Sequence, residues 1–101
     1  MPMMPPKTIA IDFDNTFTAD PYMWAATVKV FKARGHQPLC VTARRDTAEN
    51  ADAINAVFDH HNCQMPIYFS SLGSKLAFME SRGIKVDIWI DDDPQSVVRG
   101  L

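Results

Sequence analysis

Hydrophobic residues occur in four short runs along this 101-residue chain, and polar residues, glycines and prolines separate the runs. The runs are rich in Ile, Val, Leu and aromatic residues, which favour β-strands. This pattern predicts strands at residues 7–12, 37–42, 66–69 and 86–90.

The segments between these strands carry apolar residues at helical spacing. Asp20 and Pro21 form a typical helix start, with Asp at the N-cap and Pro at the first helical position. The stretch 46–49 (DTAE) resembles a capping box that opens a second helix, and Ser74 is placed to cap a third. A last short helix begins at Pro94.

The alternation of strands and helices predicts an α/β fold, with a mostly parallel sheet and helices on its faces. The length is that of one domain, residues 1–101, with residues 1–6 as a short N-terminal tail. The hydrophobic share of 47%, which includes 10% aromatic residues, is that of a folded globule.

Charge and targeting signals narrow the expected partners. The net charge of −2 gives no reason to expect binding to nucleic acid or to an anionic membrane. No apolar stretch is long enough to span a bilayer, and residues 1–6 (MPMMPP) are too short and proline-rich for a signal peptide. We expect Cys40 and Cys63 to be free thiols in a cytoplasmic protein, with a disulfide between them as the alternative.

Polar residues with chemical potential follow the predicted strands. The carboxyl ends of parallel strands meet at one edge of a sheet, where α/β proteins bind their ligands. The residues expected at that edge are Asp12 and Asp14 after the first strand, Thr42 at the end of the second, Lys75 after the third, and Asp91 and Asp92 after the fourth.

Carboxylates gathered at one edge repel one another unless a cation lies among them, and oxygen ligands alone favour Mg²⁺. The Thr42 hydroxyl and the Lys75 ammonium group are suited to holding a phosphate. One carboxylate can attack phosphorus, and a second can protonate the leaving oxygen and then activate water. The residue types therefore predict a phosphoryl-transfer site.

Four segments resemble the motifs of the haloacid dehalogenase (HAD) superfamily of phosphatases, in the same order. They are DFDNT at 12–16, VT at 41–42, Lys75, and IWIDDDP at 88–94. The resemblance implies a Rossmann-like three-layer sandwich, with four or five mostly parallel strands and helices on both faces. It also implies hydrolysis of a phosphate monoester through an aspartyl-phosphate intermediate.

The same resemblance assigns catalytic roles. Asp12 would be the nucleophile and Asp14 the general acid/base, while Thr42 and Lys75 would hold the phosphate. Mg²⁺ would be bound by the Asp12 carboxylate, the Asp14 main-chain carbonyl and a carboxylate of the fourth motif. In related DDDP endings the second residue of the aspartate pair binds the metal directly, which favours Asp92, with its neighbour Asp91 in support.

Several neighbouring residues have two interpretations. Asn15, which stands where many family members have Gly, and Arg44 are predicted to contact the substrate, and a solvated charge pair with Arg45 is the alternative for Arg44. Thr16 is interpreted as a structural hydroxyl of the turn. Trp24 is assigned to the core of the first helix, with the entrance of the site as the alternative.

The family inserts cap domains at two places, and here only residues 17–20 and 70–74 fill them. We therefore expect a capless enzyme with an open site. Such a site admits a phosphorylated macromolecule, a nucleic-acid end, a nucleotide or a small metabolite, unless a neighbouring subunit of a homo-oligomer covers it.

Two other functions were weighed against a phosphatase. A catalytically inactive HAD-like domain could bind phosphate or metal, or serve in protein interaction. A phospho-aspartate receiver domain also uses Asp, Thr, Lys and Mg²⁺, but it needs five strands and a different order of these residues. The glycine motifs of nucleotide-binding dehydrogenases and P-loop proteins are absent from the sequence.

Overall fold

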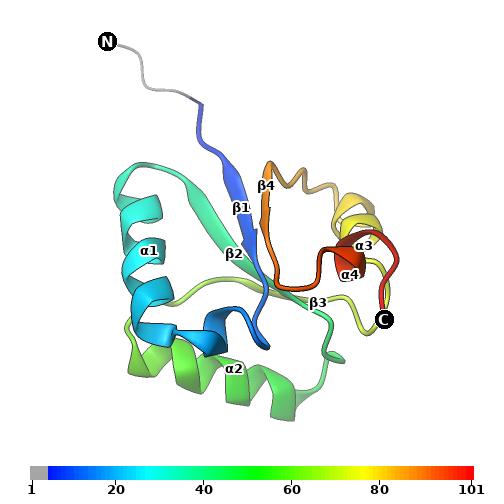
Figure 1. Cartoon of the computed structure of the whole chain (residues 1–101), viewed down its shortest axis with the longest axis horizontal. Helices are drawn as coiled ribbons and strands as arrows, with labels where there is room; N and C mark the ends of the chain where they lie inside the picture. The colour runs from blue at the N-terminus through cyan, green and yellow to red at the C-terminus, as the bar shows by residue number, and fades with distance from the viewer. Residues whose placement is uncertain (1–4) are drawn as a thin grey trace.

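A computed structural model describes residues 5–101 and shows an α/β fold built on one four-stranded parallel sheet (Figure 1). The predicted alternation of strands and helices is confirmed. In chain order the elements are β1 (Thr8–Ile11), η1 (Phe17–Ala19), α1 (Pro21–Ala33), β2 (Gln37–Thr42), α2 (Ala48–His60), β3 (Ile67–Phe69), α3 (Lys75–Ser81), β4 (Ile88–Ile90) and α4 (Pro94–Val98).

The strand order is β3-β2-β1-β4, and every neighbouring pair is parallel. The chain moves outward from β1 through β2 to β3 and then returns to place β4 on the other side of β1. In open α/β sheets, ligands bind at the carboxyl ends of the strands where the order reverses in this way. The topology therefore predicts a ligand-binding site among the residues that follow β1 and β4.

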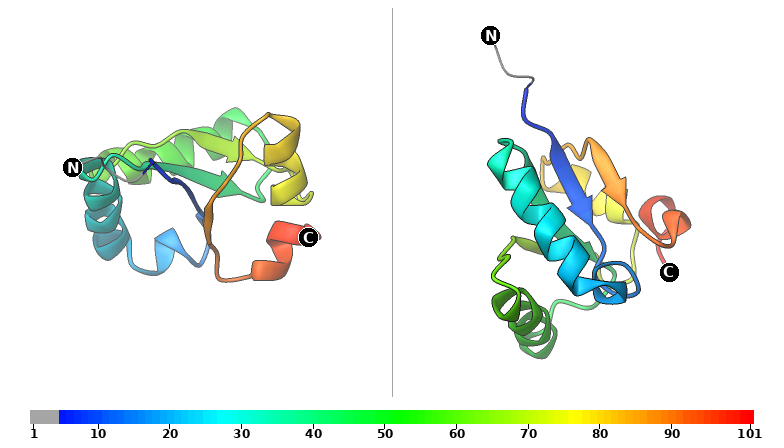
Figure 2. Two further views of the ribbon diagram at one scale, coloured as in Figure 1. Left: turned by 90° about the horizontal axis from the view of Figure 1, so that it is seen from above. Right: turned by 60° about the vertical axis from the view of Figure 1, so that its left-hand side comes forward.

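Side chains of β1 alternate between two cores, as the period of a strand requires. Ile9 and Ile11 belong to a core that includes Val28 of α1 and residues of α2. Ala10 belongs to a second core that includes Met79 of α3. Figure 1 shows α1 and α2 on one side of the sheet and α3 on the other, and Figure 2 shows α1 running back from the carboxyl end of β1.

Local capping explains where the helices begin. Asp20 and Ser74 each accept a hydrogen bond from a backbone N–H in the first turn of α1 and α3, as predicted. The predicted capping box at 46–49 is wrong in detail, because Thr47 is the N-cap of α2 and its hydroxyl accepts from the Asn50 N–H at 3.1 Å. Thr47 has the extended backbone typical of an N-cap, which leaves residue 46 outside the helix.

The last strand is shorter than the predicted range 86–90. The Asp87 carboxylate accepts a hydrogen bond from the Thr8 N–H at 2.9 Å, and the Asp87 N–H donates to the Thr8 carbonyl at 2.9 Å. This exchange ties the segment before β4 to the start of β1. Regular pairing between the two strands then covers only Ile88–Ile90.

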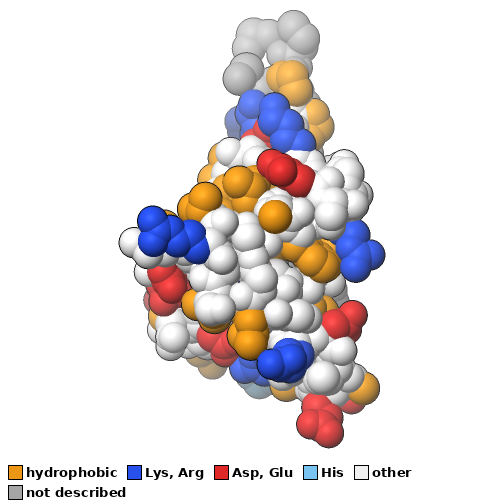
Figure 3. Space-filling model, turned by 90° about the vertical axis from the view of Figure 1, so that its right-hand side faces the viewer, with side chains coloured by type: hydrophobic (Ala, Val, Ile, Leu, Met, Phe, Trp, Pro, Cys, Tyr) orange, Lys and Arg blue, Asp and Glu red, His pale blue; other side chains and the backbone are white. Residues whose placement is uncertain are grey.

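The connections around the carboxyl edge are short. Residues 12–20 link β1 to α1, and residues 70–74 link β3 to α3. On the face formed by α3 and α4, acidic and basic side chains are interspersed (Figure 3).

Cys40 and Cys63 are buried free thiols. None of the helices within residues 5–101 has the length and apolar character needed to cross a membrane.

Candidate active site

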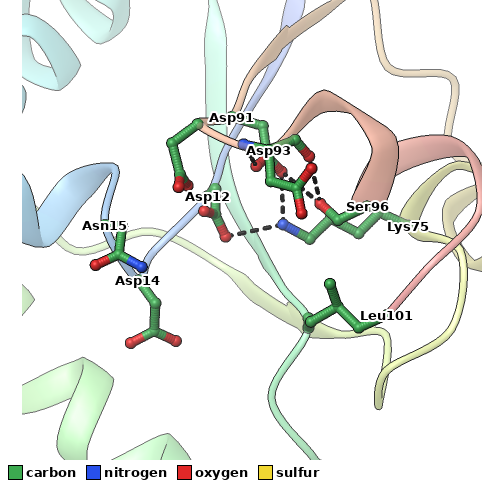
Figure 4. Close-up of a pocket in the computed structure, with 10 residues that line it drawn as sticks. Asp12, Asp14, Asn15, Lys75, Asp91, Asp93, Ser96 and Leu101 are labelled. Carbon is green, nitrogen blue, oxygen red and sulfur yellow. Dashed lines mark hydrogen bonds and ion pairs between the residues drawn. The ribbon is translucent and has the colours of Figure 1, made fainter.

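Two strand ends and the start of α3 meet at one edge of the sheet. The backbone N–H of Asp12 donates to the Ile90 carbonyl at 2.9 Å, which joins the loops that follow β1 and β4. A pocket of about 220 Å³ opens there (Figure 4). Six of the eight predicted site residues line it: Asp12, Asp14, Asn15, Lys75, Asp91 and Asp92.

Lys75 connects the carboxylates at the base of this pocket. Its Nζ donates to Asp12 Oδ1 at 2.8 Å and to Asp91 Oδ2 at 2.6 Å. The Lys75 residue is only 1% exposed and Asp12 only 8%. A lysine this deeply buried is stable only when paired, and both of its partners come from other segments of the chain.

Burial and ion pairing shift the pKa values of Asp12 and Lys75 in opposite directions. Burial raises the pKa of Asp12 to about 6, although the hydrogen bond from Lys75 acts in the opposite direction. Burial also lowers the pKa of Lys75, but the hydrogen bonds to Asp12 and Asp91 outweigh it, so that this pKa lies above its ordinary value. Lys75 is therefore a permanent positive charge beside a carboxylate that is costly to ionise.

Three carboxylates of the site could hold a metal ion. Oxygen atoms of Asp12, Asp91 and Asp92 lie within 4.8 Å of one another. When all three are ionised, the single charge of Lys75 leaves an excess of two negative charges. A hard divalent cation matches both this excess and the oxygen-only ligand set, so the residues present fit Mg²⁺.

The two aspartates after β4 differ in what already binds them. Asp91 accepts from Lys75 and from the Asp93 N–H at 2.9 Å, and the Ser96 hydroxyl lies 3.4 Å from the Asp91 carboxylate. Asp92 is exposed, and contacts with Asp12 and Thr16 hold its pKa below the usual range. Asp92 therefore has more oxygen capacity left for a cation, in keeping with its predicted role as the direct ligand.

Thr16 has a larger role than its interpretation as a turn hydroxyl assigned to it. Its Oγ1 lies 3.1 Å from Asp12 Oδ2 and 2.9 Å from Asp92 Oδ1, and it accepts from the Asp92 N–H at 3.0 Å. The hydroxyl has one proton to share between the two carboxylates, and it is buried. Its position four residues after Asp12, in a turn that follows a strand, is the only sequence signal for this contact.

Asp14 and Arg44 pair with each other. Arg44 Nη2 and Nε donate to the two Asp14 oxygens at 2.8 and 2.9 Å, and the guanidinium carbon lies 5.2 Å from the centre of the Phe13 ring. The Asp14 hydrogen bond raises the pKa of Arg44. Figure 4 shows the Asp14 carboxylate directed away from Asp12 and Lys75. The predicted acid/base group and the predicted substrate contact thus neutralise each other in this structure.

The remaining two predicted residues differ in their access to the pocket. Thr42 is fully buried, and its hydroxyl accepts from the Arg44 N–H at 3.2 Å. The neighbouring Ala43 lines the pocket in its place. Asn15 is exposed at the rim with φ of 62°, a left-handed conformation that Asn tolerates better than most residues. This backbone requirement explains an Asn at a position where Gly would also fit.

Leu101 is a wall residue that sequence reasoning missed (Figure 4). Its N–H donates to the Leu72 carbonyl at 2.8 Å. Gly100 makes this approach possible, because it has φ of 84° and a Cβ there would lie 2.6 Å from the carbonyl carbon of Gly73. The contact depends on a close approach of two distant loops, for which the sequence carries no local signal.

No family model, curated protein or solved structure matches this chain. The function must therefore be argued from the residues and their geometry.

Proposed function

We propose that this chain is a Mg²⁺-dependent phosphatase of the HAD type, without a cap domain. The observation that carries the proposal is the buried contact of Lys75 with Asp12, whose carboxylate also lies within 4.8 Å of those of Asp91 and Asp92. Few binding tasks besides phosphate chemistry call for a nucleophile, a fixed cation and a divalent-metal site in one pocket.

The Asp12 carboxylate would attack the phosphorus atom of a monoester. Lys75 already contacts Asp12 and would stabilise charge on the transferred phosphoryl group. Asp12, Asp92 and Asp91 would hold Mg²⁺, which when bound supplies the positive charge that lets phosphate approach the carboxylates. Once Asp14 has left Arg44 and taken up a proton from solvent, it would give that proton to the leaving oxygen, and as a carboxylate it would then accept a proton from the water that hydrolyses the aspartyl phosphate.

This mechanism requires Asp14 to leave Arg44. The pair is partly exposed, with side-chain exposures of 31% for Arg44 and 48% for Asp14, so that water can replace the contact at modest cost. A phosphate arriving in the pocket would offer Arg44 another anionic partner. The predicted roles of Arg44 as substrate contact and Asp14 as acid/base are compatible with the structure under this exchange.

The same ion pair favours the alternative function, a catalytically inactive domain of this fold that binds phosphate or metal. If Arg44 holds Asp14 permanently, the site lacks a free acid/base group. The proposed substrates are nucleotides, nucleic-acid ends and other phosphoesters. The proposal also includes a cytoplasmic location and a homo-oligomer that would cover the open site.

Turnover of a panel of phosphate esters in Mg²⁺ tests the proposal, with the wild type beside Asp12→Asn. We expect hydrolysis that needs Mg²⁺, is lost with EDTA and vanishes in the variant. Beryllium fluoride should form an adduct on Asp12, visible by ¹⁹F NMR in the wild type alone. A folded wild type that binds Mg²⁺ but hydrolyses nothing would support the inactive binding domain instead.

A further inference from the structure

A second pocket of about 290 Å³ lies directly beside the candidate active site. It shares Asn15, Asp91 and Asp92 with the first pocket, so that these residues form the wall between the two. Its other lining residues are Thr16, Ala19, Trp24 and Ile90. A group attached to a phosphate in the first pocket therefore needs only to pass this wall to reach the second.

The second pocket differs from the first in chemistry. Ala19, Trp24 and Ile90 give it apolar surface, whereas carboxylates and Lys75 dominate the first. Trp24 is half-buried, since part of its side chain packs against the core under α1 while part lines the pocket. The interpretation of Trp24 as a core residue is confirmed, and its side chain also lines this second pocket, while it does not line the first.

The size and lining of the pocket limit what it can hold. Its volume is close to the lower end of the range typical of small-molecule sites, so it fits one ring system rather than a folded partner. The face of a tryptophan favours either a flat aromatic ring or a cation. Lys75 and a divalent metal would neutralise the carboxylates of the shared wall, which leaves the apolar surface to select the ligand.

We propose that this second pocket binds an aromatic ring in the leaving group of the phosphate monoester, stacked on Trp24. The inference rests on the proposed phosphatase function and narrows its substrate class. Stacking of one base on an aromatic side chain corresponds to an affinity gain of roughly fivefold to a hundredfold. The ring would also orient the ester so that its phosphorus faces Asp12.

Two substrates that differ only in the ring provide the test. Adenosine 5′-monophosphate and ribose 5-phosphate share the sugar and the phosphate linkage. We expect kcat/KM to be at least about fivefold higher for the nucleotide, and Trp24→Leu to bring the ratio close to one. Trp24→Phe should retain most of the preference. Tyr22→Leu, an exposed aromatic residue of the same helix outside both pockets, should leave the ratio unchanged.

A second measurement uses the wild type alone, so that it holds even if the Trp24 variants do not fold. Free adenosine should inhibit wild-type hydrolysis of ribose 5-phosphate competitively, whereas free ribose should not. O-Phosphotyrosine, in which the ring is bonded to the phosphate oxygen itself, shows how far the ring can lie from phosphorus, and a preference for either aromatic ester supports the proposal.

The outcomes separate the two proposals. Equal kcat/KM for the nucleotide and ribose 5-phosphate, in an active enzyme, would overturn the ring pocket and leave the phosphatase intact. Faster hydrolysis of phosphocholine than of both aromatic esters would also overturn it, because the pocket would then select a cation. Absence of hydrolysis of every ester would instead refute the phosphatase, and with it the leaving-group pocket.

Discussion

Two ion pairs bind aspartates of the DFDNT segment, and their surroundings are opposite. Lys75 holds Asp12 with side-chain exposures of 2% and 9%, while Arg44 holds Asp14 with exposures of 31% and 48%. The closest N···O distance is 2.8 Å in both pairs. Geometry alone therefore does not distinguish them, and the difference lies in how much water surrounds the charges.

Water decides what each pair can do. In the buried pair, removal of Lys75 leaves the Asp12 carboxylate with no counter-charge where solvent hardly reaches it, so the lysine must stay in place for the fold to keep its stability. In the exposed pair, water and ions replace a lost partner at little cost, so that the pair can open and close. One segment thus presents a fixed carboxylate at Asp12 and an exchangeable one at Asp14, as a nucleophile and an acid/base group require.

The largest expected effect comes from breaking the buried pair. Lys75→Met keeps an unbranched side chain of nearly the same length and removes its charge, which leaves Asp12 and Asp91 uncompensated. We expect the free energy of unfolding at pH 7.5, without divalent cations, to fall by about 3–5 kcal/mol. Urea denaturation followed by circular dichroism measures this, and hydrolysis of the panel esters should be lost in the same variant.

Arg44→Gln is the matched control for the exposed pair. Its effect on the free energy of unfolding should stay below about 1 kcal/mol and shrink further in 1 M NaCl, because salt screens exposed charges. Equal destabilisation by the two substitutions would contradict the contrast between a fixed and an exchangeable pair.

The pKa of Asp12 gives a pH-dependent test of the same contrast. This pKa rises from 3.8 to about 6 on folding, chiefly through burial, so the folded chain binds the proton more tightly than the unfolded chain. The resulting stabilisation is complete below pH 3.8 and is lost as the pH rises through 6. The shift corresponds to a loss on the order of 3 kcal/mol in metal-free protein at pH 7.5.

The Asp12→Asn variant has no ionisable group at this position, so it should lack the loss of stability that the wild type shows as the pH rises through 6. Without metal, the variant should be more stable than the wild type at pH 7.5 and closer to it at pH 4, by urea denaturation across the pH range. Mg²⁺ should stabilise the wild type more than the variant at pH 7.5, since only the wild type offers a charged Asp12 carboxylate as a ligand. A wild type whose stability rises steadily from pH 4 to pH 7.5, relative to the variant, would contradict the raised pKa.

A further expected effect concerns Thr16, which contacts Asp12 and Asp92 without binding substrate in the proposed mechanism. Thr16→Val keeps the shape and removes the hydroxyl. Mg²⁺ affinity, measured by isothermal titration calorimetry, should fall about 10- to 100-fold, as for other residues that orient metal ligands. Thr16→Ser should restore most of it. Thr27→Val, on the exposed face of α1, should bind Mg²⁺ like the wild type.

Local patterns predicted the framework well. Short runs rich in β-branched and aromatic residues located all four strands, and Asp20 and Ser74 marked the starts of α1 and α3. The capping box at 46–49 failed because Asp46 and Thr47 are both good caps, and backbone geometry selected the second. The predicted start of the last strand was wrong because Asp87 bonds to the start of β1 through its side chain, a contact that depends on an already formed sheet.

The sequence by itself determined which residues reach the carboxyl edge, because strand and helix signals are local and a parallel sheet brings its carboxyl ends together. Only the tertiary structure decided how those residues pair. Lys75 could have met any nearby carboxylate, and burial against β1 and β4 assigned it Asp12 and Asp91. Arg44 took Asp14, and Trp24 came to line a second pocket. Such pairings join segments tens of residues apart, and their energies depend on burial, a property of the folded chain rather than of any short stretch of it.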